Sequence, residues 1–287
     1  MNCLACGLEM SVLLTPDQVT HPTCLMIEEP VEGQDPFSVL LKQELVDIIK
    51  WQAKRNPREW QVNIGPSEIG NPCDRSIGYR LVDLPGTNVE FDPWASIVGT
   101  AIHAWLDKAV KEWVRERQQP WTNADEEWLT ETELALDGII TGHADLYSYK
   151  HEAVIDWKTA GVDVMRKVVK DGPPDGYRIQ THIYGYLFEK AGYPVKKVAL
   201  VFLPRASTLS KIYVWSADYS RTVAETALAR MYGIASKVVE LDPLTEGHEH
   251  RWEQLEATPG NHCGFCPWYD PGRDPERGAD KTGCPGR

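Results

Sequence analysis

The chain has 287 residues, of which 42% are hydrophobic and 25% are charged. These values lie near the average of globular proteins and exclude a disordered, collagen-like or coiled-coil chain, and the length suits one main α/β domain with a small appendage. Lys and Arg number 30 against 42 Asp and Glu, a formal net charge of −12, so the protein does not coat nucleic acid through bulk positive charge.

No apolar run approaches the roughly 20 residues that a membrane helix needs. The first ten residues, MNCLACGLEM, lack the basic and apolar regions of a signal peptide. We therefore expect a cytoplasmic protein with no membrane partner. Seven cysteines fall into two groups and one outlier, which in a reducing compartment indicates metal sites rather than disulfides.

The first cysteine group lies in residues 1–27. Cys3 and Cys6 form one pair, and His21 and Cys24 form a second pair after fourteen intervening residues. This spacing is typical of a structural zinc site, so we expect a zinc knuckle over 1–27. It would serve as a folded cap or contact nucleic acid or a partner, and the sequence does not separate these roles. An acidic linker over 28–36 and a helical connector over 37–63 follow.

The remaining elements are predicted from periodicity and turn residues. Asp35-Pro36 predicts the start of a helix that runs to about residue 55, and residues 65–81 are interpreted as turn-rich. Apolar residues at every third or fourth position predict a long helix, and alternation predicts an antiparallel meander of three strands. The predicted elements in chain order are a helix over about 94–118, strands within 130–136, 139–149 and 153–159, a helix over about 177–190, strand-like segments at 195–204 and 211–216, and a helix over about 220–241.

Two carboxylates and a lysine stand out in the predicted meander. The strand period of two places Asp156 and Lys158 on one face, and a hairpin would bring Asp145, eleven positions earlier, beside Asp156. Two adjacent carboxylates repel unless a cation lies between them. Such a set, with a lysine beside it, suits metal-assisted phosphodiester hydrolysis; a salt-bridged edge strand is the alternative for an isolated Asp-x-Lys.

At this point the sequence resembles the PD-(D/E)xK nuclease superfamily, and within it the RecB-type exonuclease branch that includes CRISPR-adaptation nucleases and phage exonucleases. His103, in Gly-Thr-Ala-Ile-His on the long helix, matches the family's metal-binding histidine, and Gln180 and Tyr184 match its Q-x-x-x-Y motif. The resemblance implies an α/β fold with a mixed central sheet flanked by helices over 64–287. It also implies that His103, Asp145, Asp156 and the Trp157 carbonyl bind Mg²⁺ or Mn²⁺, that Lys158 is the catalytic lysine, and that Gln180 and Tyr184 support it.

The remaining cysteines match the iron–sulfur staple of the same branch, in which one cysteine before the nuclease core joins three at the C-terminus. They are Cys73, Cys263, Cys266 and Cys284. Four thiolates suit a [4Fe–4S] cluster or a zinc ion, and free thiols are a further alternative. The gap between Cys266 and Cys284 is longer than the family usually shows, which leaves His262 as an alternative fourth ligand.

Other side chains offer weaker indications. Basic residues that could contact phosphates are Arg75, Arg80, Arg166, Lys167 and Lys170, although most such charges are simply solvated. Trp268 and Tyr269 would stack on an unpaired base or pack in the core. Glu131 and Glu133 would aid a second ion, and an alternating polar strand face explains them equally well.

The sequence thus predicts a metal-dependent DNA exonuclease, encoded by a phage or mobile element, that acts in DNA recombination, repair or processing. Its partners would be DNA, single-stranded or with free ends, and a recombination or replication protein. The main alternative is a catalytically silent DNA-binding or assembly protein that keeps the nuclease fold. A zinc-ribbon regulator of transcription would leave the residues beyond the linker unexplained.

Overall fold

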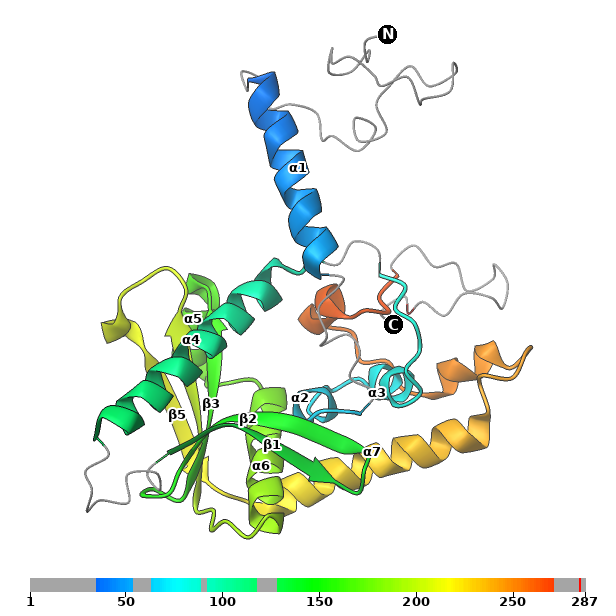
Figure 1. The fold of residues 1–287 in the computed structure, drawn as a ribbon. Coiled ribbons are helices and arrows are strands. Elements are labelled where there is room, and N and C mark those ends of the chain that lie inside the picture. The colour runs from blue at the N-terminus through cyan, green and yellow to red at the C-terminus, as the bar shows by residue number, and fades with distance from the viewer. Residues whose placement is uncertain (1–34, 54–62, 89–91, 118–127, 271–283, 285–287) are drawn as a thin grey trace. The chain divides into compact units, whose positions relative to one another are not determined.

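The computed structural model describes residues 35–53, 63–88, 92–117, 128–270 and 284 (Figure 1). The chain divides into two compact units, residues 1–60 and 61–287. The zinc knuckle predicted for 1–27, with Cys3, Cys6, His21 and Cys24, lies outside the described residues.

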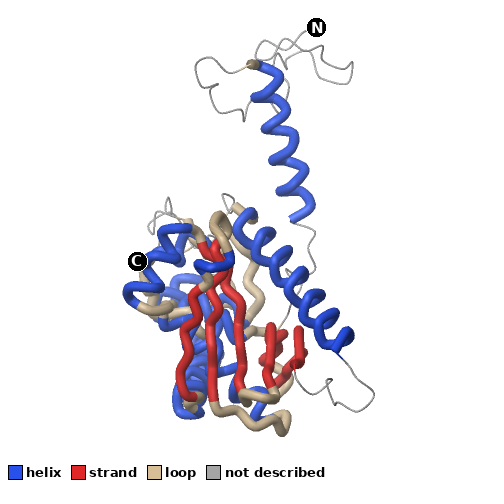
Figure 2. Tube along the Cα trace, turned by 90° about the vertical axis from the view of Figure 1, so that its left-hand side faces the viewer, coloured by secondary structure: helices blue, strands red, loops and turns tan. Residues whose placement is uncertain are grey.

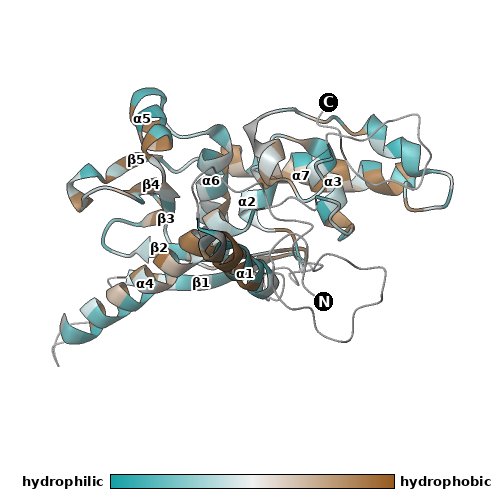
Figure 3. Cartoon of the chain, turned by 90° about the horizontal axis from the view of Figure 1, so that it is seen from above, coloured by the Kyte–Doolittle hydropathy of each residue, from teal (hydrophilic) through white to brown (hydrophobic). Residues whose placement is uncertain are grey.

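The described part of the first unit is one helix, α1 (Pro36–Ala53). It confirms the helix predicted after Asp35, whose Oδ2 accepts a hydrogen bond from the backbone N–H of Ser38 at 3.3 Å, as a helix N-cap does. Several apolar side chains of α1 are exposed, among them Phe37, Ile48 and Trp51, and brown, apolar colour is visible on α1 where Figure 3 views the helix nearly end-on.

The second unit is built on a mixed sheet of five strands in the order β1-β2-β3-β4-β5. Neighbours are antiparallel except for the parallel pair β3 and β4, and the sheet appears nearly face-on in Figure 2. The predicted meander is confirmed as the first three strands, and its first turn contains Asp137 and Gly138, both with left-handed φ. The strand bounds are β1 Trp128–Leu136, β2 Ile140–Ser148, β3 Ala153–Ala160, β4 Lys197–Pro204 and β5 Tyr213–Asp218.

Helices lie against this sheet and against each other. The long helix α4 contacts β1 and β3, whereas α6 contacts β1, β3, β4 and α7. Ser220 caps α7, accepting from the backbone N–H of Val223. The bounds are α2 Pro66–Ile69, α3 Asp74–Leu81, α4 Trp94–Arg117, α5 Val162–Asp171, α6 Asp175–Lys190, α7 Arg221–Leu241, and the 3₁₀ turns η4 Leu209–Lys211, η5 Glu249–Gln254 and η6 Asn261–Phe265.

The interpretation of residues 65–81 as turn-rich was wrong, because α2 and α3 occupy most of that segment. Helix α3 buries Ile77 and Tyr79. Gly78 lies so close to Leu255 that an added Cβ would stand 2.6 Å from the Leu255 Cδ1. Partners distant in sequence therefore stabilise this short helix, which no local periodicity predicts.

The main core lies between the sheet and helices α6 and α7. It includes the fully buried Tyr147, Ile183, Phe188, Val198 and Met231. Tyr147 stacks on Phe188 with ring centroids 4.7 Å apart, so β2 and α6 are held in a defined register. Of the helices in the described residues, none is both long and apolar enough to cross a membrane.

Candidate active site

The first part of the site lies where β2 and β3 separate. The last paired residues of the two strands are Leu146 and Ile155. Beyond this pair, the Asp145 carboxylate links β2 to β3 and to α4. Its Oδ2 accepts from the backbone N–H of Trp157 at 2.7 Å, and its Oδ1 lies 2.9 Å from the Nδ1 of His103 on α4. The structure therefore brings His103 and Asp145 together beside the backbone of β3.

Asp156, Lys158 and Gln180 form the second part. The Lys158 Nζ lies 2.7 Å from Asp156 Oδ2 and donates to Gln180 Oε1 at 3.0 Å. The Gln180 Nε2 in turn donates to Asp156 Oδ1 at 3.0 Å, so the three side chains close a ring. The side-chain amide of Gln180 on α6 thus orients both charged groups of β3, the Asp156 carboxylate and the Lys158 ammonium.

Burial and charge set the protonation of this ring. Asp156 is only 3% exposed, and burial raises the pKa of Asp156 to about 6 although Lys158 opposes the change. Burial by itself would lower the pKa of Lys158, but the charge and hydrogen bond of Asp156 outweigh it, so the pKa of Lys158 is raised. Lys158 therefore stays protonated, and its Nζ lies 4.8 Å from the centre of the Tyr177 ring, a cation–π distance.

Tyr184, predicted to support the lysine, lies one helical turn after Gln180 and is buried. Burial, followed by the charges of Asp156 and Asp145, raises the pKa of Tyr184 well above its usual range. Its hydroxyl packs over Gly142 of β2, where an added Cβ would stand 3.0 Å from it. Tyr184 is therefore a protonated phenol wedged between α6 and β2.

His103, Asp145 and Glu131 form a group of possible metal ligands. Their ligand atoms all lie within 4.8 Å of one another. The hydrogen bond to Asp145 raises the pKa of His103 against the effect of burial, and burial together with the charge of Asp145 raises the pKa of Glu131. Asp156, which the resemblance placed with His103 and Asp145, is not in this group, because Lys158 and Gln180 hold its carboxylate.

Glu131 is the residue whose role sequence reasoning left undecided. It has a left-handed φ of 44° in the middle of β1, a conformation that is uncommon for a residue with a side chain. Its neighbours Thr130 and Thr132 pair with Leu146 and Ala144, so Glu131 lies at the level of Asp145. Only the pairing register could have distinguished it from Glu133, which is exposed and pairs with His143.

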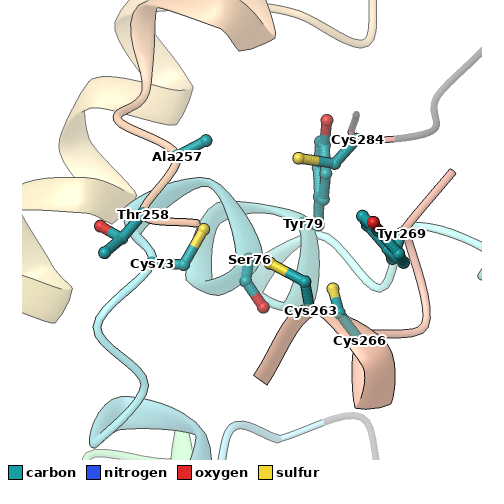
Figure 4. A pocket seen from close by; sticks show the side chains of 9 residues that line it. All are labelled: Cys73, Ser76, Tyr79, Ala257, Thr258, Cys263, Cys266, Tyr269 and Cys284. Carbon is teal, nitrogen blue, oxygen red and sulfur yellow. The ribbon is translucent and has the colours of Figure 1, made fainter. Parts of the chain in front are cut away.

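The four predicted cysteine ligands line one pocket (Figure 4). The pocket encloses about 330 Å³ outside the atoms, part of it open to solvent. Cys284 lies at this pocket because its backbone pairs with residues 268–270. Its N–H donates to the Trp268 carbonyl at 2.6 Å, and its carbonyl accepts from the backbone N–H of Asp270 at 2.8 Å. The described side chains do not include that of His262, the alternative ligand.

The structure corrects or refines two of the weaker indications. Arg75 is not a phosphate-contacting residue: it is buried and donates to the Leu255 and Glu253 carbonyls and to the Cys284 sulfur. Arg80 is paired with Glu68 at 2.7 Å. Trp268 packs in the core, where its Nε1 donates to the Leu84 carbonyl at 2.9 Å.

No curated protein matches the chain. Among solved structures, a phage-related exonuclease from Haemophilus somnus 129PT is 16% identical, with 60% of this chain and 82% of that one covered and a TM-score of 0.41. An alkaline exonuclease from Laribacter hongkongensis is 12% identical, with 64% and 91% covered and a TM-score of 0.43. Likenesses this weak add nothing to an assignment.

The family assignment rests on a sequence match instead. The family model described as the PD-(D/E)XK nuclease superfamily matches residues 97–270, more than half of the chain. The matched segment includes His103, Asp145, the Asp156-x-Lys158 pair and Gln180, which are the residues that meet at the end of β3. The chain belongs to the PD-(D/E)XK nuclease superfamily.

Proposed function

We propose that this protein is a metal-dependent DNA exonuclease that hydrolyses phosphodiester bonds. The observation that carries the proposal is the buried Asp156–Lys158–Gln180 ring beside the His103–Asp145 pair. Burying the charges of Asp156 and Lys158 beside the Asp145 carboxylate costs free energy. Such a cost is typical of functional sites, where the charges act in binding or catalysis. The exonuclease mode comes from the resemblance of His103, Gln180 and Tyr184 to the RecB-type branch.

The residues of the site fit a hard divalent ion. His103, Glu131 and Asp145 offer one nitrogen and carboxylate oxygens at mutual distances within 4.8 Å, and such donors suit Mg²⁺ or Mn²⁺. Burial and, after it, the charge of Asp145 raise the pKa of Glu131, and a cation between the two carboxylates would relieve their repulsion. On the family's pattern, Asp156 and the Trp157 carbonyl complete the proposed ligand set.

Each side chain then has a distinct part in hydrolysis. When bound, the ion would polarise the scissile phosphate and lower the pKa of a coordinated water. Lys158, kept protonated by Asp156, would donate to the attacking water or to the charge that develops on the phosphate. Gln180 holds Lys158 and Asp156 in one orientation, and Tyr184 anchors α6 against β2 behind them.

We further propose that the pocket of Cys73, Cys263, Cys266 and Cys284 holds a [4Fe–4S] cluster. A tetrahedral zinc with bonds of about 2.3 Å needs its sulfurs about 3.8 Å apart. Among the described residues, no three of these sulfurs lie within 4.8 Å of one another, which favours the larger cluster. A cluster there would tie the chain after the core to α3 and so close a very long loop.

The remaining expectations are proposals of the same kind. Residues 1–27 would form a zinc knuckle on Cys3, Cys6, His21 and Cys24, joined through the linker 28–36 and the connector 37–63 to the nuclease domain 64–287. The substrate would be DNA that is single-stranded or has free ends. We propose a phage-encoded enzyme of DNA recombination, repair or processing, acting in the host cytoplasm with a recombination or replication protein.

The test is digestion of DNA labelled at one end, linear or circular and single- or double-stranded, with Mg²⁺, Mn²⁺ or EDTA. We expect linear DNA to be degraded from an end in a metal-dependent manner, while covalently closed circles persist. The Lys158→Met variant controls for contaminating nucleases. Metal-bound wild-type protein that binds DNA yet cuts no more than the variant would favour the catalytically silent alternative.

A further inference from the structure

Arg75 is a buried cation at the cysteine pocket. It follows Cys73 on α3 and is only 6% exposed. Its guanidinium donates through Nε to the Leu255 carbonyl at 3.2 Å, through Nη2 to the Glu253 carbonyl at 3.4 Å, and through Nη1 to the Cys284 sulfur at 3.8 Å. Each of the three guanidinium nitrogens thus donates to an identified acceptor.

In the part of the chain that the structure describes, Arg75 has hydrogen-bond acceptors but no carboxylate partner. Within the described ranges, no Asp or Glu forms an ion pair with Arg75, and the two carbonyls supply dipoles rather than charge. Burial of a guanidinium without an anionic partner is strongly unfavourable, because arginine side chains keep their charge in proteins. An anion is therefore expected within reach of it.

Among the described contacts of Arg75, the group that can carry negative charge is the Cys284 sulfur, which lines one pocket with the sulfur-bearing residues Cys73, Cys263 and Cys266. Neutral thiols would leave the guanidinium uncompensated, whereas cysteines that bind a metal do so as thiolates. We propose that Arg75 is the counter-ion of an anionic metal–thiolate centre formed by Cys73, Cys263, Cys266 and Cys284. This inference rests on the proposed cluster, and it adds a residue that holds the charge of that centre.

Two consequences follow from the position of Arg75. A fixed cation beside a thiolate ligand stabilises the more negative, reduced state of an iron–sulfur cluster, so Arg75 raises its reduction potential. Arg75 also connects Cys284 to α3 and to the chain at 253–255, so it retains the ligand that is most remote from Cys73 in sequence.

Arg230 provides a matched control in the same region. From α7 its guanidinium donates to the Asn71 and Pro72 carbonyls, just before Cys73, and it pairs with the carboxylate of Asp74. It resembles Arg75 in its carbonyl contacts but has its own anion and makes no contact with a cysteine sulfur. Replacing it disturbs the loop that carries Cys73 without removing the charge at the sulfurs.

The experiment compares full-length wild type, Arg75→Gln, Arg75→Lys and Arg230→Gln, purified anaerobically. Iron and zinc content are measured first. The midpoint potential then comes from a reductive titration followed by electron paramagnetic resonance, and the rate of metal loss to a chelator from absorbance. We expect Arg75→Gln to have a more negative potential and faster metal loss, Arg75→Lys a potential near that of wild type, and Arg230→Gln the wild-type potential.

Each outcome decides a different point. Metal-loaded Arg75→Gln with the potential and metal retention of wild type would overturn the inference while leaving the cluster intact. Wild-type protein with neither iron nor zinc at the four cysteines would overturn the proposed centre and this inference together. If zinc occupies the site, Arg75→Gln must lose it faster than Arg230→Gln does. If the Gln variant does not fold, a folded Arg75→Lys protein that lacks the centre would contradict the role of charge.

Discussion

The backbone N–H of Trp157 donates to Asp145 Oδ2 at 2.7 Å just beyond Leu146 and Ile155, the last paired residues of β2 and β3. The carboxylate thereby replaces the main-chain acceptor that a continued ladder would have supplied. Its other oxygen is left to face His103 at 2.9 Å. The separation of two strands therefore orients the Asp145 carboxylate through a backbone N–H of β3 rather than through a side chain of that strand.

Removal of Lys158 should separate catalysis from stability. Lys158→Met leaves the buried Asp156 carboxylate unpaired, so we expect a loss of about 3–5 kcal/mol in the free energy of unfolding. The pKa of Asp156, already about 6, would rise further. A raised folded-state pKa of an acid costs stability as pH increases, so the loss should be larger at pH 8 than at pH 5.

The double variant Asp156→Asn/Lys158→Met should regain most of that stability while remaining inactive. Nuclease activity should fall at least about a hundredfold in both variants, because the charge that acts on the phosphate or the ion is gone. Urea unfolding at the two pH values and cleavage of labelled DNA measure the two effects. Recovery of activity in the double variant would rule out the proposed role of the pair.

Glu131→Gln should weaken binding of Mn²⁺ by about tenfold, since one of the grouped ligands loses its charge. In metal-free protein the same change should increase stability slightly, because it removes repulsion between Glu131 and Asp145. Calorimetric titration and thermal unfolding measure the two effects. Glu133→Gln, an exposed change on the same strand, is the control. Equal affinities in the two variants would exclude Glu131 from the ion site.

His182 should make the protein less stable in acid. It is 6% exposed and its Nδ1 accepts from the backbone N–H of Ser220 at 3.2 Å, and burial lowers the pKa of His182. The unfolded chain then binds the proton more readily, so stability is complete above the ordinary histidine pKa of about 6.5 and declines as pH falls below it.

His182→Asn should reduce this decline, because an amide oxygen can accept from Ser220 at any of these pH values. Denaturant unfolding between pH 5 and pH 8 gives the difference from wild type, with His250→Asn, an exposed change, as control. Parallel pH profiles for wild type and His182→Asn would show that the histidine does not contribute.

Gly142→Ala should displace Tyr184 and reduce both stability and activity. The new Cβ would stand 2.8 Å from Pro66 Cδ and 3.0 Å from the Tyr184 hydroxyl, and overpacking of this kind costs about 1–3 kcal/mol. Gly233→Ala on α7, where nothing lies within 4 Å, should instead stabilise by up to about 1 kcal/mol. Thermal unfolding compares them, and a stable, fully active Gly142→Ala would mean that Tyr184 has room to move.

Deletion of residues 1–30 should leave turnover on a short oligonucleotide nearly unchanged, since residues 61–287 form a compact unit of their own. Affinity for long DNA is expected to fall if the proposed knuckle supplies a tethered second contact. Steady-state kinetics and binding to long DNA measure the two effects. A soluble truncated protein that keeps its metal but cannot cut would place the N-terminal segment in the active fold.

The sequence by itself determined the elements whose information is local. Alternation along β1, β2 and β3 and the apolar period of α4 depend on near neighbours, so their positions could be predicted closely. The relative positions of the motif residues are also local. A two-residue strand period puts Asp156 on the same face as Lys158, and an i, i+4 spacing puts Gln180 on the same helix face as Tyr184.

The tertiary structure alone decided the contacts between distant segments. Gln180 on α6 bridges Asp156 and Lys158 of strand β3, and Glu131 lies at the level of Asp145 only through the pairing register. Arg75 contacts residues about 180 to 209 positions away. No local pattern encodes such partners, because they depend on how the elements pack. A basic residue near Cys73 therefore resembled a surface contact for DNA until packing placed its charge against a buried sulfur.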